Sequence, residues 1–505
     1  MTVSRRDFLR VSAYAAMAPG LSGIARSSTD AGALCRKLRA DAMRPQFHLL
    51  PASNWMNDPN GPIYYRGRYH MFFQYNPNAA VWGDMHWAHA SSVDMIHWRH
   101  EPVAMAPTPK GFDQFGVFSG SAVLDGDTPT MIYTGVMPPA SEKEVTLSDE
   151  QHKWREVQCL ATSHDRDLRT WQKLAEPVIA TPPPGLEITG FRDPYVWREG
   201  NSWMLILGSG ARGKSGMVLL YRSTDLRHWT YLHPLVEGSG LEEGDMWECP
   251  DLFPLGGKHV LLLSTKGKTH WKVGTYRDQR FFPEKEGLTD WGAFYAAKTM
   301  PDRDGNRILW GWIPETRPES EHSAAGWAGV MSLPRVCTLN DAQELEMEVV
   351  PAVRNLRKRN HHAPMNEMRR EPSLGSLRIH DLSAELQLEC RPKGDAFTIN
   401  LESETGNNFA TISCTNRSGK RELQVNEVKA AFPGGERELI KLHFFLDGSV
   451  LEVFANGTTV ITARVYQVPS TPLRLVLKGD AELISAQLWQ MEPSSKDRLT
   501  GSLCG

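Results

Sequence analysis

One pattern of apolar and polar positions recurs along the first two-thirds of the chain. Each copy has a short apolar strand, a turn that carries glycine or a charge, and a second apolar strand. Four clear copies and a weaker fifth lie at residues 61–74, 120–133, 193–206, 250–263 and 292–312. Repeated β-meanders at an irregular period of about 40–75 residues are typical of a β-propeller. We therefore predict an all-β fold whose first domain is a five-bladed β-propeller.

A second repeated segment distinguishes a propeller from a plain β-sandwich. A short segment with an aspartate and a closing tryptophan follows three of the copies, at residues 92–98, 164–171 and 223–229. Independent strands of a sandwich have no reason to repeat such a segment at a fixed place after each hairpin. This repeated segment therefore favours the propeller.

Short strands with period-two alternation fill residues 376–491. The clearest of them are 386–390, 397–401 and 441–446. Asp447-Gly448 and Asn456-Gly457 flank the apolar run 449–455, which predicts two consecutive hairpins. Strands of this kind over about 115 residues predict a C-terminal β-sandwich.

A charged stretch separates the two patterns. We interpret residues 336–372 as a linker across the surface, with a helix as one option for its form. Its basic run at 354–362 is typical of a solvated face, and a polyanion-binding site is the alternative. The predicted organisation is an export signal at 1–30, the propeller at 44–335, this linker, the sandwich at 373–493 and a tail at 494–505.

Composition supports this division and excludes some functions. Of the 16 tryptophans, all but Trp489 lie between Trp55 and Trp327. With 56 Lys+Arg against 59 Asp+Glu the formal charge is -3, which argues against a nucleic-acid-binding protein. The seven cysteines are scattered without a C-x-x-C, so we expect mostly buried thiols rather than a zinc site or a dense disulfide framework.

The N-terminus predicts export. Ser4-Arg-Arg-Asp-Phe-Leu9 precedes the mildly apolar run Val11–Leu21, and together they are typical of a twin-arginine signal. No other apolar run approaches the roughly 18 residues of a membrane span. We therefore expect a mature protein that acts in the periplasm or outside the cell and does not insert into a membrane.

The repeats also predict where chemistry gathers. Residues just before the first strand of each copy should meet at one end of the central channel of the propeller. These positions hold Asn57-Asp58, Phe118-Ser119, Arg192-Asp193 and Glu248-Cys249. Three carboxylates, a hydroxyl and a guanidinium would thus converge from four blades.

Each of these residues also has a structural explanation. Asn57-Asp58 lies in a turn-forming sequence, Arg192-Asp193 could pair at a strand end, and Glu248 could be a solvated loop acid. Their shared position in the repeat outweighs these separate explanations. Paired acids among the aromatic residues Trp55, Trp82, Phe118 and Trp247 fit glycoside chemistry, because aromatic faces hold sugar rings while two acids supply nucleophile and proton donor.

Four motifs at these positions resemble the signature of glycoside hydrolase family 32, the β-fructosidases that include invertases, levanases and inulinases. They are Trp55-Met-Asn-Asp-Pro-Asn-Gly61, Phe118-Ser-Gly-Ser121, Phe191-Arg-Asp-Pro194 and Trp247-Glu-Cys-Pro250. Further similar segments are 82–87, 326–335 and Leu451-Glu-Val-Phe454. The resemblance extends from about residue 44 to residue 489, although the charged loop Met137–Trp154 looks longer than is usual in the family.

The resemblance implies a retaining hydrolase that releases fructose from sucrose, inulin or levan, without a cofactor or a catalytic metal. Asp58 would be the nucleophile, Glu248 the acid/base and Asp193 the stabiliser of the transition state, with Arg192 holding the local charge pattern. The sugar-binding positions of the family fall on Asn57, Gln74, Trp82, Phe118, Ser119, Arg192 and Trp327.

Three alternatives stay open at this stage. A fructosyltransferase would use the same site, with a sugar in place of water as the acceptor. A non-catalytic carbohydrate-binding protein would use the two domains as recognition surfaces. An inverting arabinan-type propeller hydrolase would need its carboxyl groups roughly 6.5–9.5 Å apart. The preferred linkage, β-2,6 or β-2,1, and the oligomeric state are also left open.

Overall fold

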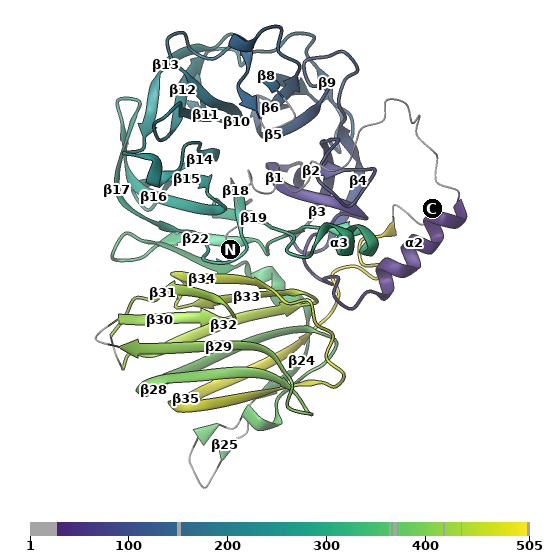
Figure 1. Ribbon diagram of the computed structural model, residues 1–505, viewed down its shortest axis with the longest axis vertical. Coiled ribbons are helices and arrows are strands. Elements are labelled where there is room, and N and C mark those ends of the chain that lie inside the picture. The colour runs from purple at the N-terminus through teal and green to yellow at the C-terminus, as the bar shows by residue number, and fades with distance from the viewer. Residues whose placement is uncertain are drawn as a thin grey trace.

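The computed structural model describes residues 28–148, 153–362, 365–366, 371–372, 374–417, 420–435 and 437–501. The twin-arginine segment predicted at the N-terminus lies outside these residues. The described chain begins with helix α2 (Ser28–Ala40), continues through a propeller and ends in a large sheet domain beside it (Figure 1). None of the helices in this part of the chain is long and apolar enough to cross a membrane.

Five antiparallel sheets form the propeller, and β1, β5, β10, β14 and β18 are its innermost strands (Figure 1). Blade one contains β1 (Asn54–Tyr65), β2 (Arg68–Asn76), β3 (His86–Ser92) and β4 (Trp98–Met105). Blade two contains β5 (Gly116–Asp125), β6 (Thr128–Met137), β7 (Leu147–Ser148), β8 (Lys153–Thr162) and β9 (Gln172–Lys173). Blade three contains β10 (Ile188–Glu199), β11 (Ser202–Ala211), β12 (Gly216–Ser223) and β13 (Thr230–Glu237).

Blades four and five complete the ring. Blade four contains β14 (Glu248–Leu255), β15 (Lys258–Thr265), β16 (Lys268–Arg277) and β17 (Arg280–Leu288). Blade five contains β18 (Tyr295–Pro301), β19 (Arg307–Ile313), β21 (Val330–Met331), β22 (Arg335–Leu339) and β23 (Leu345–Val349). The five-bladed propeller predicted from the repeats is thus confirmed.

The hydrophobic pattern explains why the second strands of the blades are buried on both faces. Strands β6, β11 and β15 are buried along almost their whole length, and each contains a central run of apolar residues, 131–133, 203–207 and 260–263. A strand packed against neighbouring blades on both faces needs apolar residues at successive positions rather than at alternate ones. These strands therefore fill the spaces between blades.

A short crossing segment ties the last blade to the first. After β19 the chain forms helix α3 (Glu319–Ala325), which ends at Gly326 with φ 83°, and then strand β20 (Trp327–Ala328). Strand β20 pairs in parallel with β1 through Asn54 and Trp55. The residue at the helix end must adopt a left-handed conformation, which glycine does without strain.

The predicted linker is more ordered than expected. Strand β23 is the outer strand of blade five, and a 3-10 turn (Pro351–Leu356) and β24 (Arg357–His362) follow it. In β23 the buried residues alternate with Glu346 and Glu348, so the high charge of this segment concealed a strand pattern. The propeller therefore extends about 15 residues beyond the predicted boundary at residue 335.

The C-terminal domain is a β-sandwich, as predicted, but two of its strands are unusually long. Strands β28 (Ser383–Ser403) and β35 (Leu473–Met491) pair with each other along most of their lengths. The predicted strands 386–390 and 397–401 are the two ends of β28, separated by an irregularity near Pro392. The remaining main strands are β29 (Asn408–Arg417), β30 (Lys420–Val425), β31 (Val428–Ala431), β32 (Ile440–Asp447), β33 (Val450–Ala455) and β34 (Thr459–Arg464).

The two predicted hairpins are present as β32–β33 and β33–β34. In the first hairpin Asp447 pairs with Val450, so Gly448 and Ser449 form the turn, and Gly448 has φ 56°. The residues after the sandwich dock on α2, where Thr500 lies 3.5 Å from the sulfur of Cys35 and accepts a hydrogen bond from Arg39. The described end of the predicted tail thus contacts the N-terminal helix through Thr500.

Buried charges join the propeller to the sandwich. His48 lies between Asp447 (Nδ1 to Oδ2, 2.8 Å) and Glu452 (Nε2 to Oε1, 2.9 Å). Arg335 donates to Glu452 at 2.6 Å and to Asp290 at 3.0 Å. All five side chains are fully buried, so each charge is stabilised only by its partners.

The pKa values of this network follow from those contacts. Burial opposes the protonated ring of His48, but its hydrogen bonds with Asp447 and Glu452 outweigh burial and raise its pKa to about 9. Burial likewise disfavours the charged form of Glu452, and Arg335 and His48 outweigh it and lower the pKa to about 2.

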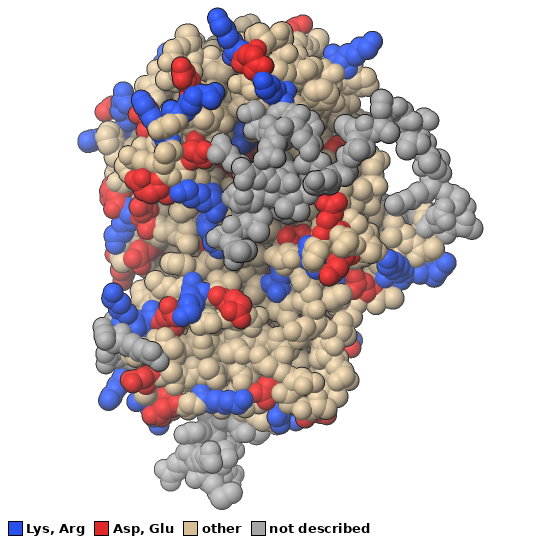
Figure 2. All heavy atoms as spheres, viewed as in Figure 1, with Lys and Arg blue, Asp and Glu red and all other residues tan. Residues whose placement is uncertain are grey.

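On the face seen in Figure 2, by contrast, surface charges of both signs are interspersed.

Candidate active site

A β-bulge interrupts each innermost strand, and in β1, β5, β10 and β14 it lies at the position that the repeats marked. The register of β1 shifts after Met56, that of β5 after Phe118, and that of β10 after Arg192. The register of β14 shifts after Glu248 and that of β18 after Tyr295. Bulges re-aim side chains and are common beside active sites. They place the predicted residues at one level of the channel.

Three of the bulges hold non-glycine residues in a left-handed conformation. Asp193 has φ 64°, Cys249 has φ 49° and Ala296 has φ 55°. Such residues cost energy and persist only where the surrounding structure fixes them, often at functional sites. Here the backbone N–H of Asp193 donates to Thr134 at 2.9 Å, and that of Cys249 donates to Oδ2 of Asp193, also at 2.9 Å.

Asp58 is a buried carboxylate that accepts hydrogen bonds from two neutral side chains. Nδ2 of Asn57 donates to its Oδ1 at 3.0 Å, and Oγ of Ser119 donates to its Oδ2 at 2.7 Å. Trp55 holds Asn57 in turn, through a 2.7 Å bond from Nε1 to Oδ1. Gln74 lies behind Ser119, with Nε2 3.4 Å from its hydroxyl oxygen. These contacts fix the orientation of the carboxylate.

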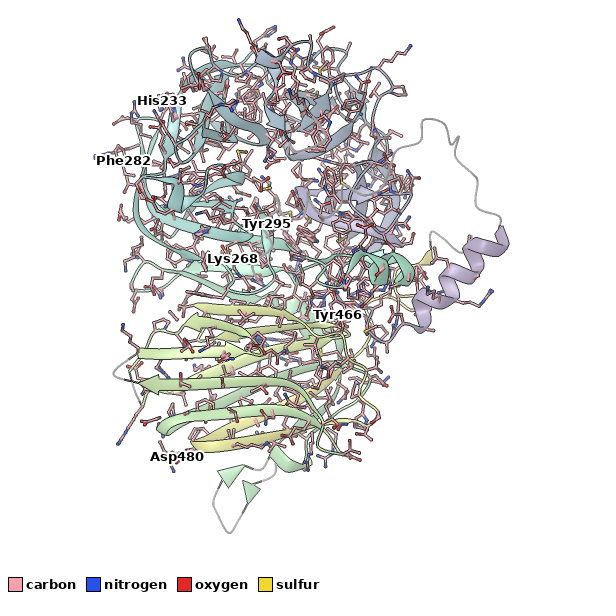
Figure 3. The ribbon with its side chains drawn as sticks, in the orientation of Figure 1. His233, Lys268, Phe282, Tyr295, Tyr466 and Asp480 are labelled. Atoms are coloured by element: carbon pink, nitrogen blue, oxygen red, sulfur yellow. The ribbon has the colours of Figure 1, made fainter. Side chains whose placement is uncertain are left out.

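Glu248 has a different environment. Its Oε1 accepts hydrogen bonds from Nε and Nη2 of Arg192 at 3.1 and 2.9 Å. Its Oε2 lies 2.5 Å from the hydroxyl oxygen of Tyr295, which Figure 3 shows near the middle of the propeller. One acid of the site thus contacts a cation and a phenol, whereas Asp58 contacts neutral donors.

The third carboxylate, Asp193, is joined to Asp58 through a thiol. The sulfur of Cys249 lies 3.5 Å from Oδ2 of Asp58 and 3.4 Å from Oδ2 of Asp193. Because Cys249 directly follows Glu248, all three predicted acids meet around this bulge of β14. The structure thus brings Asp58, Asp193 and Glu248 together from three blades.

Aromatic rings form one wall beside the acids. The ring of Trp82 lies 6.0 Å from that of Phe118, in an edge-to-face arrangement. Trp154, which was not predicted as a site residue, lies 6.4 Å from Trp82 and 6.5 Å from Phe118. Aromatic faces of this kind suit the apolar faces of sugar rings.

Trp327 lies elsewhere. Its indole Nε1 donates to Asp41 at 2.8 Å, and the guanidinium of Arg317 lies 4.6 Å from its ring centre. Successive residues of a strand point to opposite faces, and it is Ala328 that packs with Trp55 beside the acids. The structure therefore places Trp327 in the core between the domains, near Tyr466 (Figure 3), and not among the acids.

Besides Trp154, three residues of the site were absent from the prediction. Tyr295 occupies in the fifth repeat the position that Glu248 has in the fourth, so the phase of the repeats could have identified it. Cys249 lies inside one of the four motifs, but the motif gave it no role. Glu156 pairs with Arg192 at 2.9 Å from the third strand of blade two, and no repeat or motif marks it.

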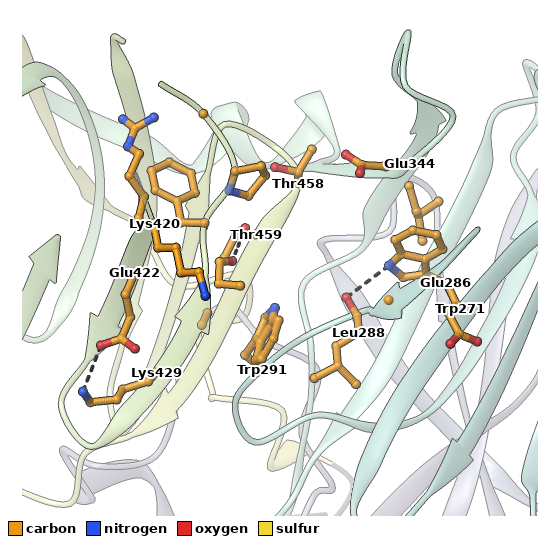
Figure 4. A pocket seen from close by; sticks show the side chains of 18 residues that line it. Trp271, Glu286, Leu288, Trp291, Glu344, Lys420, Glu422, Lys429, Thr458 and Thr459 are labelled. Atoms are coloured by element: carbon orange, nitrogen blue, oxygen red, sulfur yellow. Dashed lines mark hydrogen bonds and ion pairs between the residues drawn. The ribbon is translucent and has the colours of Figure 1, made fainter. Parts of the chain in front are cut away.

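A separate cleft of about 710 Å³ lies between blade four and the sandwich. Figure 4 shows Trp271 and Trp291 in its wall, together with the ion pair Glu422–Lys429, whose charged atoms lie 2.9 Å apart. None of the three acids described above lines this cleft. The aligned acids, and not this cleft, are the candidate catalytic centre.

The arrangement suits displacement at a sugar carbon. Among the described residues no group of three or more His, Cys, Asp or Glu side chains could hold a metal ion. An acid held in place by neutral donors, together with a second acid in a different environment, provides the pair of carboxyl groups that glycoside cleavage needs.

Comparison with known proteins agrees with this chemistry. Residues 48–348 match the glycosyl hydrolases family 32 N-terminal domain, and residues 374–490 match the family 32 C-terminal domain. The chain is 35% identical to a sucrose-6-phosphate hydrolase and 36% identical to a raffinose invertase, both of Escherichia coli, over 90% of this chain and 96% of each relative.

A solved structure gives the same result. Fructan 1-exohydrolase IIa from Cichorium intybus superposes with a TM-score of 0.75 and 27% identity, over 90% of this chain and 98% of that chain. The likeness thus covers the propeller and the sandwich together. The protein belongs to glycosyl hydrolase family 32.

Proposed function

We propose that this β-fructofuranosidase removes terminal fructose units from sucrose and related fructosides by a retaining, two-step displacement. The observation that carries the proposal is the meeting of Asp58, Asp193 and Glu248 at the bulges, with different partners for each acid. Action from the chain end is supported by the names of the relatives, an invertase and a fructan exohydrolase.

Asp58 acts as the nucleophile in this proposal. The hydrogen bonds from Asn57 and Ser119 hold its carboxylate in one orientation, so that it attacks C2 of the fructosyl unit. The bond from C2 to the leaving oxygen breaks as the bond from C2 to the Asp58 oxygen forms. The electron pair stays on the leaving oxygen, which needs a proton.

Glu248 supplies that proton and then takes one from water. In the second step the activated water attacks C2, the Asp58 carboxylate leaves, and fructose is released with its original configuration. Asp193 would hold ring hydroxyl groups through the oxocarbenium-like transition state, since its position is fixed by Thr134 and Cys249. Trp82, Phe118 and Trp154 would bound the sugar.

The same geometry bears on the alternatives. A binding protein has no need of a fixed nucleophile beside an acid with a cationic partner. A transferase needs an acceptor sugar to exclude water from the intermediate, and the presence of hydrolases among the relatives favours water.

One assay tests activity, mode and substrate together. The full chain is incubated with sucrose, raffinose, sucrose 6-phosphate, inulin or levan, and the products are separated over time. Fructose as the sole early small sugar from inulin and levan, and fructose with an equal amount of glucose, melibiose or glucose 6-phosphate from sucrose, raffinose or sucrose 6-phosphate, supports terminal hydrolysis. A ladder of oligosaccharides from inulin or levan contradicts exo-action, growth of longer sugars from sucrose indicates transfer, and no product from any sugar contradicts the function.

We also propose export through a twin-arginine signal, which is supported by Arg5-Arg6 beside Phe8-Leu9 and an apolar run. Protein should accumulate outside the cytoplasm, and Arg5-Arg6→Lys-Lys should retain it inside. Unchanged export of the double variant would contradict this proposal.

A further inference from the structure

Glu156 is a buried carboxylate whose partners belong to the neighbouring blade. It lies on β8, and its side chain has no exposed surface. A buried carboxylate needs hydrogen bonds or an opposite charge to compensate the loss of water. Both of its oxygens find such partners on β10, the strand that carries Arg192 and Asp193.

The contacts fix one short segment of β10. Oε2 of Glu156 accepts the backbone N–H of Phe191 at 2.7 Å, and Oε1 accepts Nη1 of Arg192 at 2.9 Å. The other edge of the same guanidinium, Nε with Nη2, donates to Glu248 at 3.1 and 2.9 Å. Arg192 therefore bridges two carboxylates, one from blade two and one from blade four.

This bridge resolves a conflict in the charge of the site. A guanidinium beside a carboxyl group favours its ionised form, whereas a general acid must hold a proton when the substrate binds. Arg192 alone would therefore work against the first step. The negative charge of Glu156 on the opposite edge of the guanidinium reduces the positive potential at Glu248.

We propose that Glu156 is a positioning residue for the acid/base: it holds Arg192 in place and offsets its charge, so that Glu248 keeps its proton at the working pH. The inference rests on the proposed function of Glu248 and deepens it. Glu156 acts through Arg192 and needs no contact with the sugar.

Glu248 also has other ionisable neighbours, and the Glu156 variant does not alter them. Strands β10, β11, β15 and β18 pack against β14. Strand β11 carries no ionisable side chain, and Lys258 and His259 of β15 pair with the far end of β14. The groups at the near end include Asp58, Arg192, Asp193, Cys249, Tyr295 and Lys298, and the buried Asp251 lies three residues further along β14.

The test is the pH dependence of kcat/KM for sucrose in the full chain and in Glu156→Gln. The variant keeps the shape of the side chain and removes its charge. We expect the alkaline limb to move down by on the order of one pH unit, because Glu248 then loses its proton more easily. The acidic limb of the profile should stay at the same pH. Activity on an aryl fructoside with a good leaving group should fall less than activity on sucrose.

Two comparisons separate this role from a general loss of stability. Asp113→Asn removes another buried carboxylate, which contacts Lys173 and Tyr133 away from the acids, and should leave both limbs in place. The double variant Glu156→Gln with Arg192→Gln removes both charges, and should return the alkaline limb to its original pH or above. Thermal unfolding of each variant confirms that it is folded.

The outcomes are distinct. An unmoved alkaline limb in active Glu156→Gln, or an equal shift in Asp113→Asn, overturns the inference while wild-type activity upholds the proposed function. A wild-type protein that releases no fructose overturns the function, and the inference with it. If Glu156→Gln does not fold, Glu156→Asp replaces it, because the shorter side chain draws the carboxylate away from Arg192. This variant should move the alkaline limb down by a smaller amount. An alkaline limb that stays or rises in Glu156→Asp overturns the inference.

Discussion

At the scale of single residues, the acids of the site differ in what surrounds them. Asp58 accepts hydrogen bonds from the neutral groups of Asn57 and Ser119, whereas Glu248 contacts the charged Arg192 and the phenol of Tyr295. Two carboxyl groups with different environments can hold different protonation states at one pH, which a retaining mechanism requires. The division of roles follows from these contacts.

The hydroxyl of Ser119 makes one part of this division testable. Ser119→Ala removes its 2.7 Å hydrogen bond to Asp58. Hydrogen bonds to charged groups contribute about 1.5–3 kcal/mol, so kcat/KM for sucrose should fall by roughly 10- to 100-fold. Ser121→Ala is a matched control on the same strand, because its buried hydroxyl has no hydrogen-bond partner among the described residues. An equal loss in Ser121→Ala would contradict the specific role of Ser119.

At the scale of elements, the repeats predict more than the existence of strands. Their phase marks the bulges of the innermost strands, and so the sequence alone indicates that Asp58, Asp193 and Glu248 lie at one level of the channel. The same phase applied to the weak fifth copy would have identified Tyr295.

Other features could not be predicted in this way. Glu156 lies on the third strand of a blade, where its partner on β10 is set by the packing of blades and not by local sequence. Trp327 stands beside a motif, but which face of the two-residue strand β20 it occupies depends on pairing with β1. The strand at Leu345–Val349 was missed because its alternating glutamates resemble the charge of a linker.

The bulge of β5 depends on a glycine. A Cβ atom on Gly120 would lie 2.2 Å from the carbonyl oxygen of Ile132 and 2.7 Å from the Cα of Tyr133. Gly120→Ala should therefore lower stability by about 1–3 kcal/mol and displace Ser119, with loss of activity. Gly32→Ala in α2 meets its nearest atom at 3.6 Å and should be neutral or slightly stabilising. Thermal unfolding and sucrose hydrolysis check both, and an unaffected Gly120→Ala would refute the steric argument.

At the scale of the whole molecule, the two domains form one folding unit. The apolar side chains Phe445, Val450 and Phe454 of the sandwich belong to the same core as Phe294 and Trp310 of blade five. The buried network of His48, Arg335 and their acidic partners crosses the same boundary. The sandwich therefore supports the propeller even though the predicted acids all lie outside it.

This interface predicts the behaviour of an isolated propeller. A fragment that ends at Val350 retains all five blades but exposes the core that Phe445 and Phe454 cover. We expect it to aggregate or to unfold at a much lower temperature than the full chain. A soluble fragment with full activity on sucrose would contradict this.

The pKa of His48 predicts how the interface depends on pH. Its pKa is about 9 in the folded state, above the ordinary value of 6.5, so its contribution to stability is fully present below pH 6.5 and is lost as the pH rises through 9. His48→Gln should therefore destabilise the protein more at pH 6 than at pH 9.5. Denaturant unfolding at both values measures the difference, and equal destabilisation would show that the charge of His48 has no role.

The most direct test of the catalytic roles is a comparison of Glu248→Ala with Asp58→Ala. It measures kcat/KM on sucrose and on an activated aryl fructoside, with and without azide. Glu248→Ala should lose about 10²–10⁴-fold on sucrose and less on the aryl fructoside, because that leaving group needs no proton. Azide should partly restore its turnover by attacking the intermediate without a base.

Asp58→Ala should respond neither to the leaving group nor to azide, because no covalent intermediate forms without the nucleophile. The opposite pattern, with azide and the leaving group restoring Asp58→Ala but not Glu248→Ala, would reverse the assigned roles. Full activity of both variants would show that the bulges of β1 and β14 do not hold the catalytic centre.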